Sequence, residues 1–394
     1  MLEVEGIFPG KHPSPVENSG CGAAYMADFS TSSQKKRWIF SAEEIHSKRA
    51  SCNKKSAEAL IKFGSTDLDA QAGLPDTGRA EGGLPGAGPS QGGAAPALPA
   101  VLSVADEAVL RRHYEGKLQP VCKAFSFPHK IQATALLYFK RFYLHHSVMD
   151  VDPKDIMLTC VYLACKVEES HVSADEFGKG IKQDPAAVLK NELPVLQALD
   201  FDLIVFPPYR ALEGFCHDME ERSLVSSEER AAASTSGRDW LDEAMRTDAS
   251  LMFLPGQIAL AALRVYAQRE RKERITGYVK ETLERLQGAE SLDRLSATLD
   301  DITAMVSSAG PLPEVAAVQK LDRQGKFCRK PELWRELESR KREEKKARKQ
   351  QQKQKRASHD VQSREAPPEE DPAASQDMKR RKSEPAGSAA PPGT

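Results

Sequence analysis

The sequence predicts an all-α protein: two tandem five-helix bundles with flanking N- and C-terminal helices and disordered tails. Apolar residues recur at the three- and four-residue spacing of helices, whereas the alternation typical of strands is nearly absent. Proline and serine stand where helices begin. One strongly apolar segment also recurs at a fixed offset, which indicates an internal repeat.

The first bundle is predicted over residues 102–205 and is centred on its third helix. This helix begins at Pro153, a favoured first-turn residue, and reads IMLTCVYLACK from Ile156. Because the segment is apolar on every side, other helices must surround it. The four neighbours are expected after Ser103, after Pro128, near residues 174–182 and over residues 185–199.

The second bundle, over residues 206–309, is predicted from a match to the first. Pro255 and Ile258 repeat the spacing of Pro153 and Ile156, and the apolar positions that follow also correspond. Where the fifth helix of the copy should lie, another apolar stripe has helical spacing: Leu292, Leu295, Leu299, Ile302 and Val306.

A flanking helix is predicted within residues 32–63, ahead of the bundles. Ser41 and Glu44 form a capping box at its start. The apolar stripe expected to dock on the bundles is narrow and consists of Ile45, Cys52, Ala59 and Phe63. The remaining segments are a disordered leader (1–31), a flexible Gly/Ala/Pro-rich linker (64–101), a C-terminal segment with a basic charged helix (310–356) and a disordered tail (357–394).

The composition excludes several classes of protein. Lys and Arg (56) nearly balance Asp and Glu (57), so whole-chain charge implies no particular partner. The 7 cysteines form no Cys-x-x-Cys pair and the 9 histidines show no ligand spacing, so we expect no metal, no cofactor and a reducing compartment. No apolar run is long enough to span a membrane. Neither a phosphate loop nor a nucleophile–base pair is present, so we expect no catalysis.

Several long strings carry a resemblance to a known family. Residues 133–170 (ATALLYFKRFYLHHSVMDVDPKDIMLTCVYLACKVEES) and 195–215 (VLQALDFDLIVFPPYRALEGF) resemble the first box of the cyclin family. Residues 32–44 (SSQKKRWIFSAEE) and 255–267 (PGQIALAALRVYA) resemble the H-type cyclins. MADF, from Met26, resembles the opening of plant and algal members, so residues preceding it are expected to be an added leader.

The resemblance implies two cyclin boxes and a regulatory, non-enzymatic role in the nucleus. The implied partner is the catalytic subunit of a cyclin-dependent kinase of the CDK-activating type. That kinase phosphorylates activation loops of other kinases and, within general transcription factor IIH (TFIIH), the RNA polymerase II tail. A RING-containing assembly factor and the TFIIH core are the further partners implied.

Two residues are the principal candidates for contacting the kinase. The family's lysine at the end of the third helix corresponds to Lys166, and its glutamate in the fifth helix corresponds to Glu192. The alternative interpretation is that Lys166 is an ordinary lysine with no role in binding, placed at a helix C-terminus because the helix dipole favours a positive charge there. Pro194 kinks or begins the fifth helix and so re-aims Glu192. Glu168 and Glu169 are weaker candidates, because solvated carboxylates would look the same.

The C-terminal region carries two basic clusters. Residues 339–356 hold ten basic and two acidic residues, which is typical of a solvated charged helix and also of nuclear import or weak nucleic-acid binding. A second cluster, for which we predict nuclear import, consists of Lys379, Arg380, Arg381 and Lys382.

Two alternatives remain open: a cyclin-fold general transcription factor that binds promoter DNA, and a cyclin of another transcriptional kinase. The DNA-binding alternative calls for a basic bundle surface, and here the basic runs lie outside the bundles. Tyr138 and Phe142 alternate with basic residues, but their spacing predicts core positions rather than a stacking platform. We therefore expect no direct, specific nucleic-acid partner. An enzyme on a helical scaffold has no supporting residue set.

Overall fold

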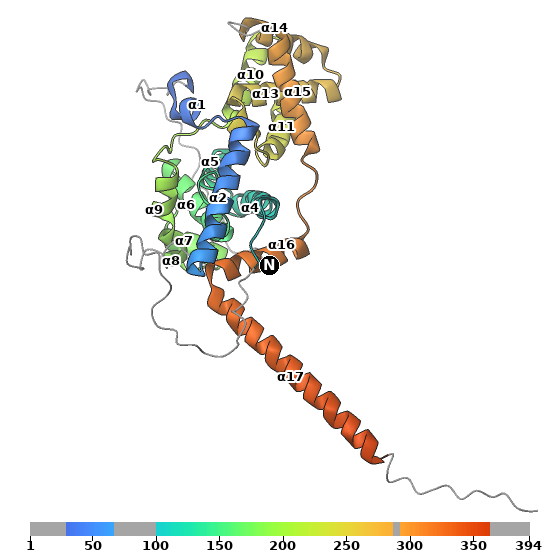
Figure 1. Ribbon diagram of the computed structural model, residues 1–394. Helices are drawn as coiled ribbons and strands as arrows, with labels where there is room; N and C mark the ends of the chain where they lie inside the picture. The colour runs from blue at the N-terminus through green and yellow to red at the C-terminus, as the bar shows by residue number, and fades with distance from the viewer. Residues whose placement is uncertain (1–28, 67–99, 287–291, 363–394) are drawn as a thin grey trace, which may run out of the picture. The chain divides into compact units, whose positions relative to one another are not determined.

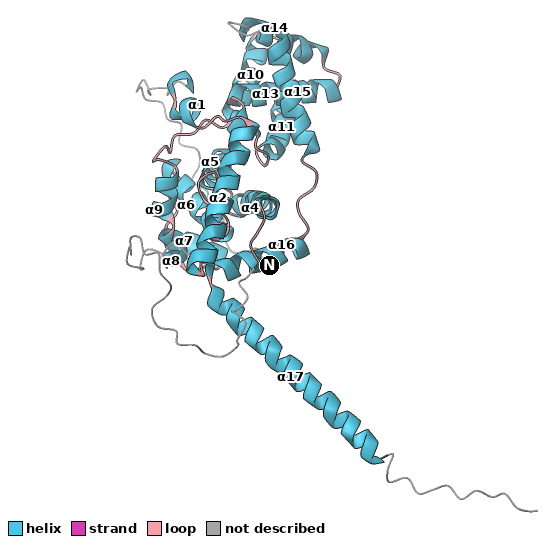
Figure 2. Cartoon of the chain, viewed as in Figure 1, coloured by secondary structure: helices cyan, strands magenta, loops and turns pink. Residues whose placement is uncertain are grey.

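The computed structural model describes residues 29–66, 100–286 and 292–362, and every regular element in these ranges is a helix (Figures 1 and 2). The predicted fold class is confirmed. Most of the expected linker, the leader and the tail lie outside the described residues. The described residues up to Arg335 form one compact unit, and those from Glu336 onward form a second.

The first bundle begins with a capped helix and is built around two enclosed ones. Ser103 caps α4 (Val104–Ala124) through a capping box with Asp106, as predicted for its start. In α5 (His129–Phe142) every residue from Ile131 to the end is buried, and in α6 (Pro153–Val167) every residue from Ile156 to Cys165 is buried. The centre of the bundle is therefore the α5–α6 pair rather than α6 alone. Three short helices follow: α7 (Ala174–Ile181), α8 (Pro185–Lys190) and α9 (Glu192–Ala198).

The prediction of a single fifth helix over residues 185–199 is wrong, because the segment is divided at Asn191 into two helices, α8 and α9. Pro194 lacks the N–H that an interior helical residue donates, so it is tolerated only in a first turn. A helix that starts at Glu192 puts Pro194 in that turn. The sequence left open whether the fifth helix kinks at Pro194 or begins there. The structure shows a new helix that begins two residues before Pro194.

The second bundle repeats the enclosed helix as predicted. α13 (Pro255–Arg269) has 15 residues and a proline in its first turn, as does α6. The stripe in α15 (Leu292–Ser308) is confirmed, since Leu295, Leu299, Ile302 and Val306 are buried. The other helices are α10 (Pro208–Glu221), α11 (Ser227–Ala244), α12 (Ala249–Met252) and α14 (Glu273–Leu286).

The N-terminal segment forms η1 (Phe29–Thr31), α1 (Ser33–Arg37) and α2 (Ala42–Phe63), with the Ser41–Glu44 capping box in place. The docking stripe of α2 differs from the prediction at its end. Leu60 is fully buried, whereas Phe63 is 46% exposed. Phe63 is the last residue of α2, and Gly64 caps the helix with a φ of +74°.

The C-terminal segment returns to the first bundle through α16 (Val315–Arg329). Asp322 accepts a hydrogen bond from Tyr114 of α4 at 2.7 Å. Arg329 donates to the Val148 carbonyl at 2.6 Å and pairs with Asp152 at 2.7 Å. α17 (Pro331–Gln362) follows and carries the basic run, whose described side chains are exposed.

Candidate partner-binding surface

Lys166 and Glu192, predicted from sequence as partner-binding residues, lie together and form an ion pair. Lys166 stands in the last turn of α6, and Glu192 is the first residue of α9. The Lys166 ammonium also lies 5.4 Å from the centroid of the Tyr162 ring. The lysine side chain remains 46% exposed, so the pair holds it in place while leaving it accessible.

The end of α6 fixes how Lys166 is presented. The Ser170 N–H donates to the Cys165 carbonyl at 2.8 Å, and Glu169 adopts a left-handed backbone with a φ of +57°. This geometry ends the helix at Val167, one residue after Lys166. A non-glycine residue in that conformation costs about 1 kcal/mol. The same conformation recurs at Asp200 and Phe201, directly after α9.

Glu168 and Glu169 differ in their surroundings. The Glu168 carboxylate accepts a hydrogen bond from Thr134 at 2.8 Å and pairs with Lys130 at 3.6 Å. Lys130 also donates to the Glu168 carbonyl at 3.1 Å. Glu168 is therefore committed to joining the end of α6 to α5, whereas Glu169 is exposed.

Exposed apolar side chains flank Glu192 in the sequence, and the sequence prediction missed them. Leu189 is 43% exposed at the end of α8, and Leu193 is 56% exposed in α9. Helical spacing could have indicated that Leu193 is exposed, because Val195 and Leu199 form the buried face of this segment and Leu193 falls outside it. Phe201 and Ile204, after α9, are 61% and 64% exposed. We group Lys166, Glu192, Leu189 and Leu193 as the candidate for contacting a partner, and refer to them below as the partner-binding surface.

The N-terminal segment holds the connection between the two bundles. The Gln34 side chain exchanges two hydrogen bonds with the backbone of Phe206, at 2.7 and 3.2 Å. Trp38 donates from Nε1 to Asp202 at 3.0 Å. The Arg141 guanidinium, fully buried at the end of α5, lies 4.6 Å from the Trp38 ring. These contacts fix the chain that leaves α9.

Burial tests the two aromatic residues of α5 that were predicted as core. Tyr138 and Phe142 are fully buried, which confirms them as core residues. The described residues contain no group of three or more His, Cys, Asp or Glu side chains arranged to hold a metal ion. In the same part of the chain, no helix is long and apolar enough to cross a membrane. The cluster Lys379, Arg380, Arg381 and Lys382 lies outside the described residues.

Comparison with known proteins identifies the family. The family description "Cyclin, N-terminal domain" matches residues 106–204, and "Cyclin C-terminal domain" matches residues 207–307. Cyclin-H1-1 of Arabidopsis thaliana is 40% identical over 306 residues, which cover 77% of this chain and 89% of that protein. The chain belongs to the cyclin family. Cyclin-H of Xenopus laevis is 35% identical over 261 residues, 63% of this cyclin and 79% of the relative. The resemblance to H-type cyclins, including the plant members, is thereby confirmed.

Two solved structures share the fold of this cyclin. A chain in the structure of the CAK complex from Chaetomium thermophilum bound to ATP-γ-S has a TM-score of 0.60 and 25% identity, and the match covers 80% of this cyclin and 94% of that chain. A chain in the structure of the yeast TFIIK (Kin28/Ccl1/Tfb3) complex has a TM-score of 0.53 and 24% identity, with coverage of 71% and 100%.

Proposed function

We propose that this cyclin binds and activates a cyclin-dependent kinase of the CDK-activating and TFIIH type. In this role it supports phosphorylation of the activation loops of other kinases and of the RNA polymerase II tail. The similarity to Cyclin-H1-1 and to a chain of the CAK complex supports this assignment. The cyclin acts as a regulatory subunit, and the chemistry belongs to its partner.

The observation that carries the proposal is the partner-binding surface. Lys166 emerges at the end of an enclosed helix, so its backbone has little freedom to move when a partner binds. Glu192 holds the ammonium by an ion pair, and Leu189 and Leu193 offer apolar area beside it. A rigid charge next to exposed apolar side chains is the combination that protein interfaces use, because little conformational entropy is lost on binding.

Activation is a shift in the kinase's conformational equilibrium. The cyclin stabilises the active conformation only by binding it more tightly than the inactive one. A shift from almost fully inactive to almost fully active needs a difference of about 5 kcal/mol. An interface of roughly 2,000 Å², in the range of signalling complexes, can supply such a difference.

The proposed kinase-activating role also implies further partners and a cellular location. We propose that a RING-containing assembly factor and the TFIIH core join the cyclin and its kinase. The complex then works in the nucleus, and we assign import to Lys379, Arg380, Arg381 and Lys382. No direct, specific contact with nucleic acid is part of this function.

Charge reversal at Lys166 tests the proposal. We expect Lys166→Glu to weaken binding of the purified kinase at least tenfold, because the reversed side chain repels Glu192 and presents the wrong charge to the partner. Lys123→Glu, in the last turn of α4, is the control with the same change in net charge. Binding is measured by calorimetry and kinase activation by phosphate transfer, with thermal melting checked for each variant.

A charge swap separates a partner contact from an internal role. The double variant Lys166→Glu with Glu192→Lys restores the internal ion pair in reverse. If Lys166 contacts the kinase, binding stays weak in the double variant. Full recovery of binding would mean that the pair only holds α6 to α9, and the assignment of Lys166 to the kinase contact would be wrong.

A further inference from the structure

A pocket of about 710 Å³ lies where α2, α4 and the second bundle meet. Its walls carry four arginines from three separate parts of the chain. Arg49 comes from α2, Arg111 and Arg112 come from α4, and Arg246 comes from the segment between α11 and α12. We call this set the arginine pocket.

The arginines of the pocket are unequally neutralised. Arg49 is fully engaged, because it makes a two-pronged contact with Asp248 at 2.6 and 2.8 Å. Arg111 is only 5% exposed, yet its ion pair with Glu107 is long, at 3.4 Å. The Arg246 side chain has no hydrogen bond or ion pair to any described residue, and its Nε is buried without a partner.

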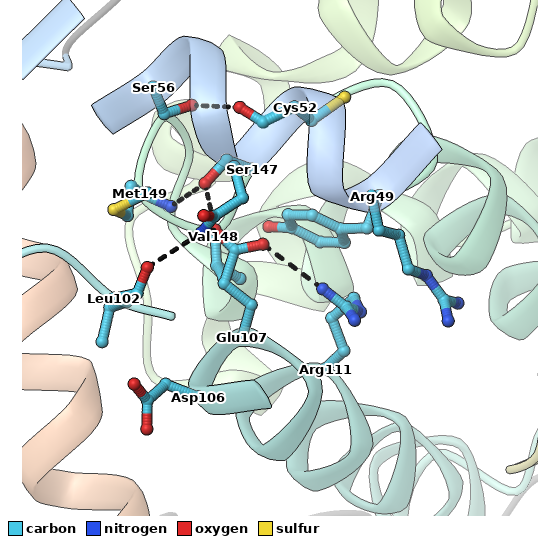
Figure 3. A network of polar contacts seen from close by, with 12 residues as sticks. Arg49, Cys52, Ser56, Leu102, Asp106, Glu107, Arg111, Ser147, Val148 and Met149 are labelled. Atoms are coloured by element: carbon cyan, nitrogen blue, oxygen red, sulfur yellow. Dashed lines mark hydrogen bonds and ion pairs between the residues drawn. The ribbon is translucent and has the colours of Figure 1, made fainter. Parts of the chain in front are cut away.

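Figure 3 shows how the carboxylate beside Arg111 is already shared. Arg111 rises from α4 with Glu107 on one side and Arg49, which descends from α2, on the other. Glu107 also accepts hydrogen bonds from Ser147 and from Asn53, the latter at 3.0 Å. Its oxygens therefore serve three donors, and Arg111 receives only a weak contact.

The charges that line the pocket, or pair with residues that line it, leave a positive excess. Lys140 reaches this region from α5 and lies 2.9 Å from Glu115 and 4.0 Å from Asp248. With the four arginines it makes a set of five cations. Three carboxylates face them: Glu107, Glu115 and Asp248. Burial, together with the charge of Arg49, lowers the pKa of Arg111 to about 10.

We propose that the arginine pocket binds a phosphoryl group, presented on a phosphorylated serine or threonine of a protein partner. A phosphorylated side chain carries about −1.5 to −2 charge at neutral pH and three acceptor oxygens, which matches the excess of two cations. Guanidinium groups bind such oxygens in a fixed, forked geometry. The volume of about 710 Å³ exceeds what a free phosphate ion fills and admits a side chain with its flanking residues.

This site is independent of the kinase-binding assignment, since none of its residues belongs to the partner-binding surface. Its walls come from the N-terminal helix and from both bundles. A bound phosphoryl group therefore joins three parts of the chain, and we expect it to raise the melting temperature of the cyclin.

Binding of defined probes to the full-length chain tests the site. The probes are a short Gly/Ala peptide with one phosphoserine, the same peptide with serine or with glutamate, and inorganic phosphate. We expect the phosphoserine peptide to bind at least tenfold more tightly than the serine and glutamate peptides in calorimetry. Inorganic phosphate is expected to compete at higher concentration. Equal binding of all three peptides would refute the proposal.

A matched pair of arginine variants locates the binding. Arg246→Gln removes the unpartnered guanidinium, and we expect at least a tenfold loss of phosphopeptide affinity with unchanged melting in the absence of ligand. Arg269→Gln, at the end of α13, removes the same charge from an exposed site that contacts Glu270 and Ser236 instead. An equal loss in both variants would show that binding follows net charge only and would overturn the assignment.

Discussion

Asp150 illustrates how single polar residues couple the N-terminal helix to the first bundle. Its carboxylate accepts a hydrogen bond from the Ser147 N–H at 3.2 Å and lies next to Ser56 of α2. Burial, opposed by the hydrogen bonds from Ser56 and Ser147, raises the pKa of Asp150 from 3.8 to about 6. The folded protein thus holds this proton more tightly than the unfolded chain does.

The raised pKa predicts a specific pH dependence of stability. Because the folded state binds the proton more tightly, the contribution of Asp150 to stability falls as the pH rises from about 4 to about 6 and is constant above that. Asp150→Asn removes the titration and keeps an acceptor. We expect the stability of the variant relative to wild type to rise by about 2 kcal/mol over this interval. Urea unfolding at several pH values measures it, and a flat difference would contradict the assignment.

Residue-scale features of this kind divide into those that a sequence reveals and those that it does not. Lys166 is recognisable as the first charge after an apolar helix, and Tyr138 is recognisable by spacing. Lys140 and Arg141 look like solvated charges in the same segment, yet both are buried, at 1% and 0% exposure. Their partners, Glu115 of α4 and Trp38 after α1, come from other parts of the chain, so only the tertiary structure reveals them.

At the scale of elements, capping residues and prolines determine most boundaries. Ser103, Ser41 and Pro153 start helices where their chemistry predicts. The division between α8 and α9 was harder to predict, because the apolar residues on either side of Asn191 continue the same helical spacing. The docking face of α2 was misassigned at its end, because apolar spacing does not show that burial stops at Leu60 and leaves Phe63, the last residue of the helix, 46% exposed.

The corrected face of α2 gives a test with an internal control. Leu60→Ala removes a fully buried side chain, and we expect a loss of about 2–4 kcal/mol in the free energy of unfolding. Phe63→Ala removes a larger side chain that is 46% exposed, and we expect a change below about 0.5 kcal/mol. Chemical denaturation measures both variants. A larger loss of unfolding free energy for Phe63→Ala than for Leu60→Ala would contradict this correction and support the docking stripe predicted from spacing, which ends at Phe63.

At the scale of the whole molecule, charge is segregated from the bundles. Residues 339–356 carry ten basic and two acidic residues. The described residues from Glu336 onward form a unit separate from the two cyclin boxes. An overall charge near zero therefore hides a basic segment that lies outside the two cyclin boxes in the sequence. This segregation could be predicted from the sequence, because charge runs are visible without any tertiary information.

Truncation after Glu338 tests whether the basic segment acts alone. We expect removal of residues 339–394 to leave melting of the rest unchanged and to abolish weak, salt-sensitive binding to duplex DNA of random sequence. The reason is that nonspecific affinity follows the number of cations placed against phosphates. Fluorescence anisotropy at several salt concentrations measures the binding. DNA affinity that survives the truncation would instead favour the promoter-binding alternative.

The return of α16 to the first bundle has a consequence for biosynthesis. Tyr114 bonds to Asp322, Asp152 to Arg329, and the Thr66 N–H to the Cys328 carbonyl, so these contacts join residues more than a hundred positions apart. The contacts of α16 with the first bundle cannot form while α16 is still inside the ribosome. A nascent chain stalled after the carboxy-terminal box should therefore remain open to proteases and chaperones, and full protection should appear only when Arg329 has emerged.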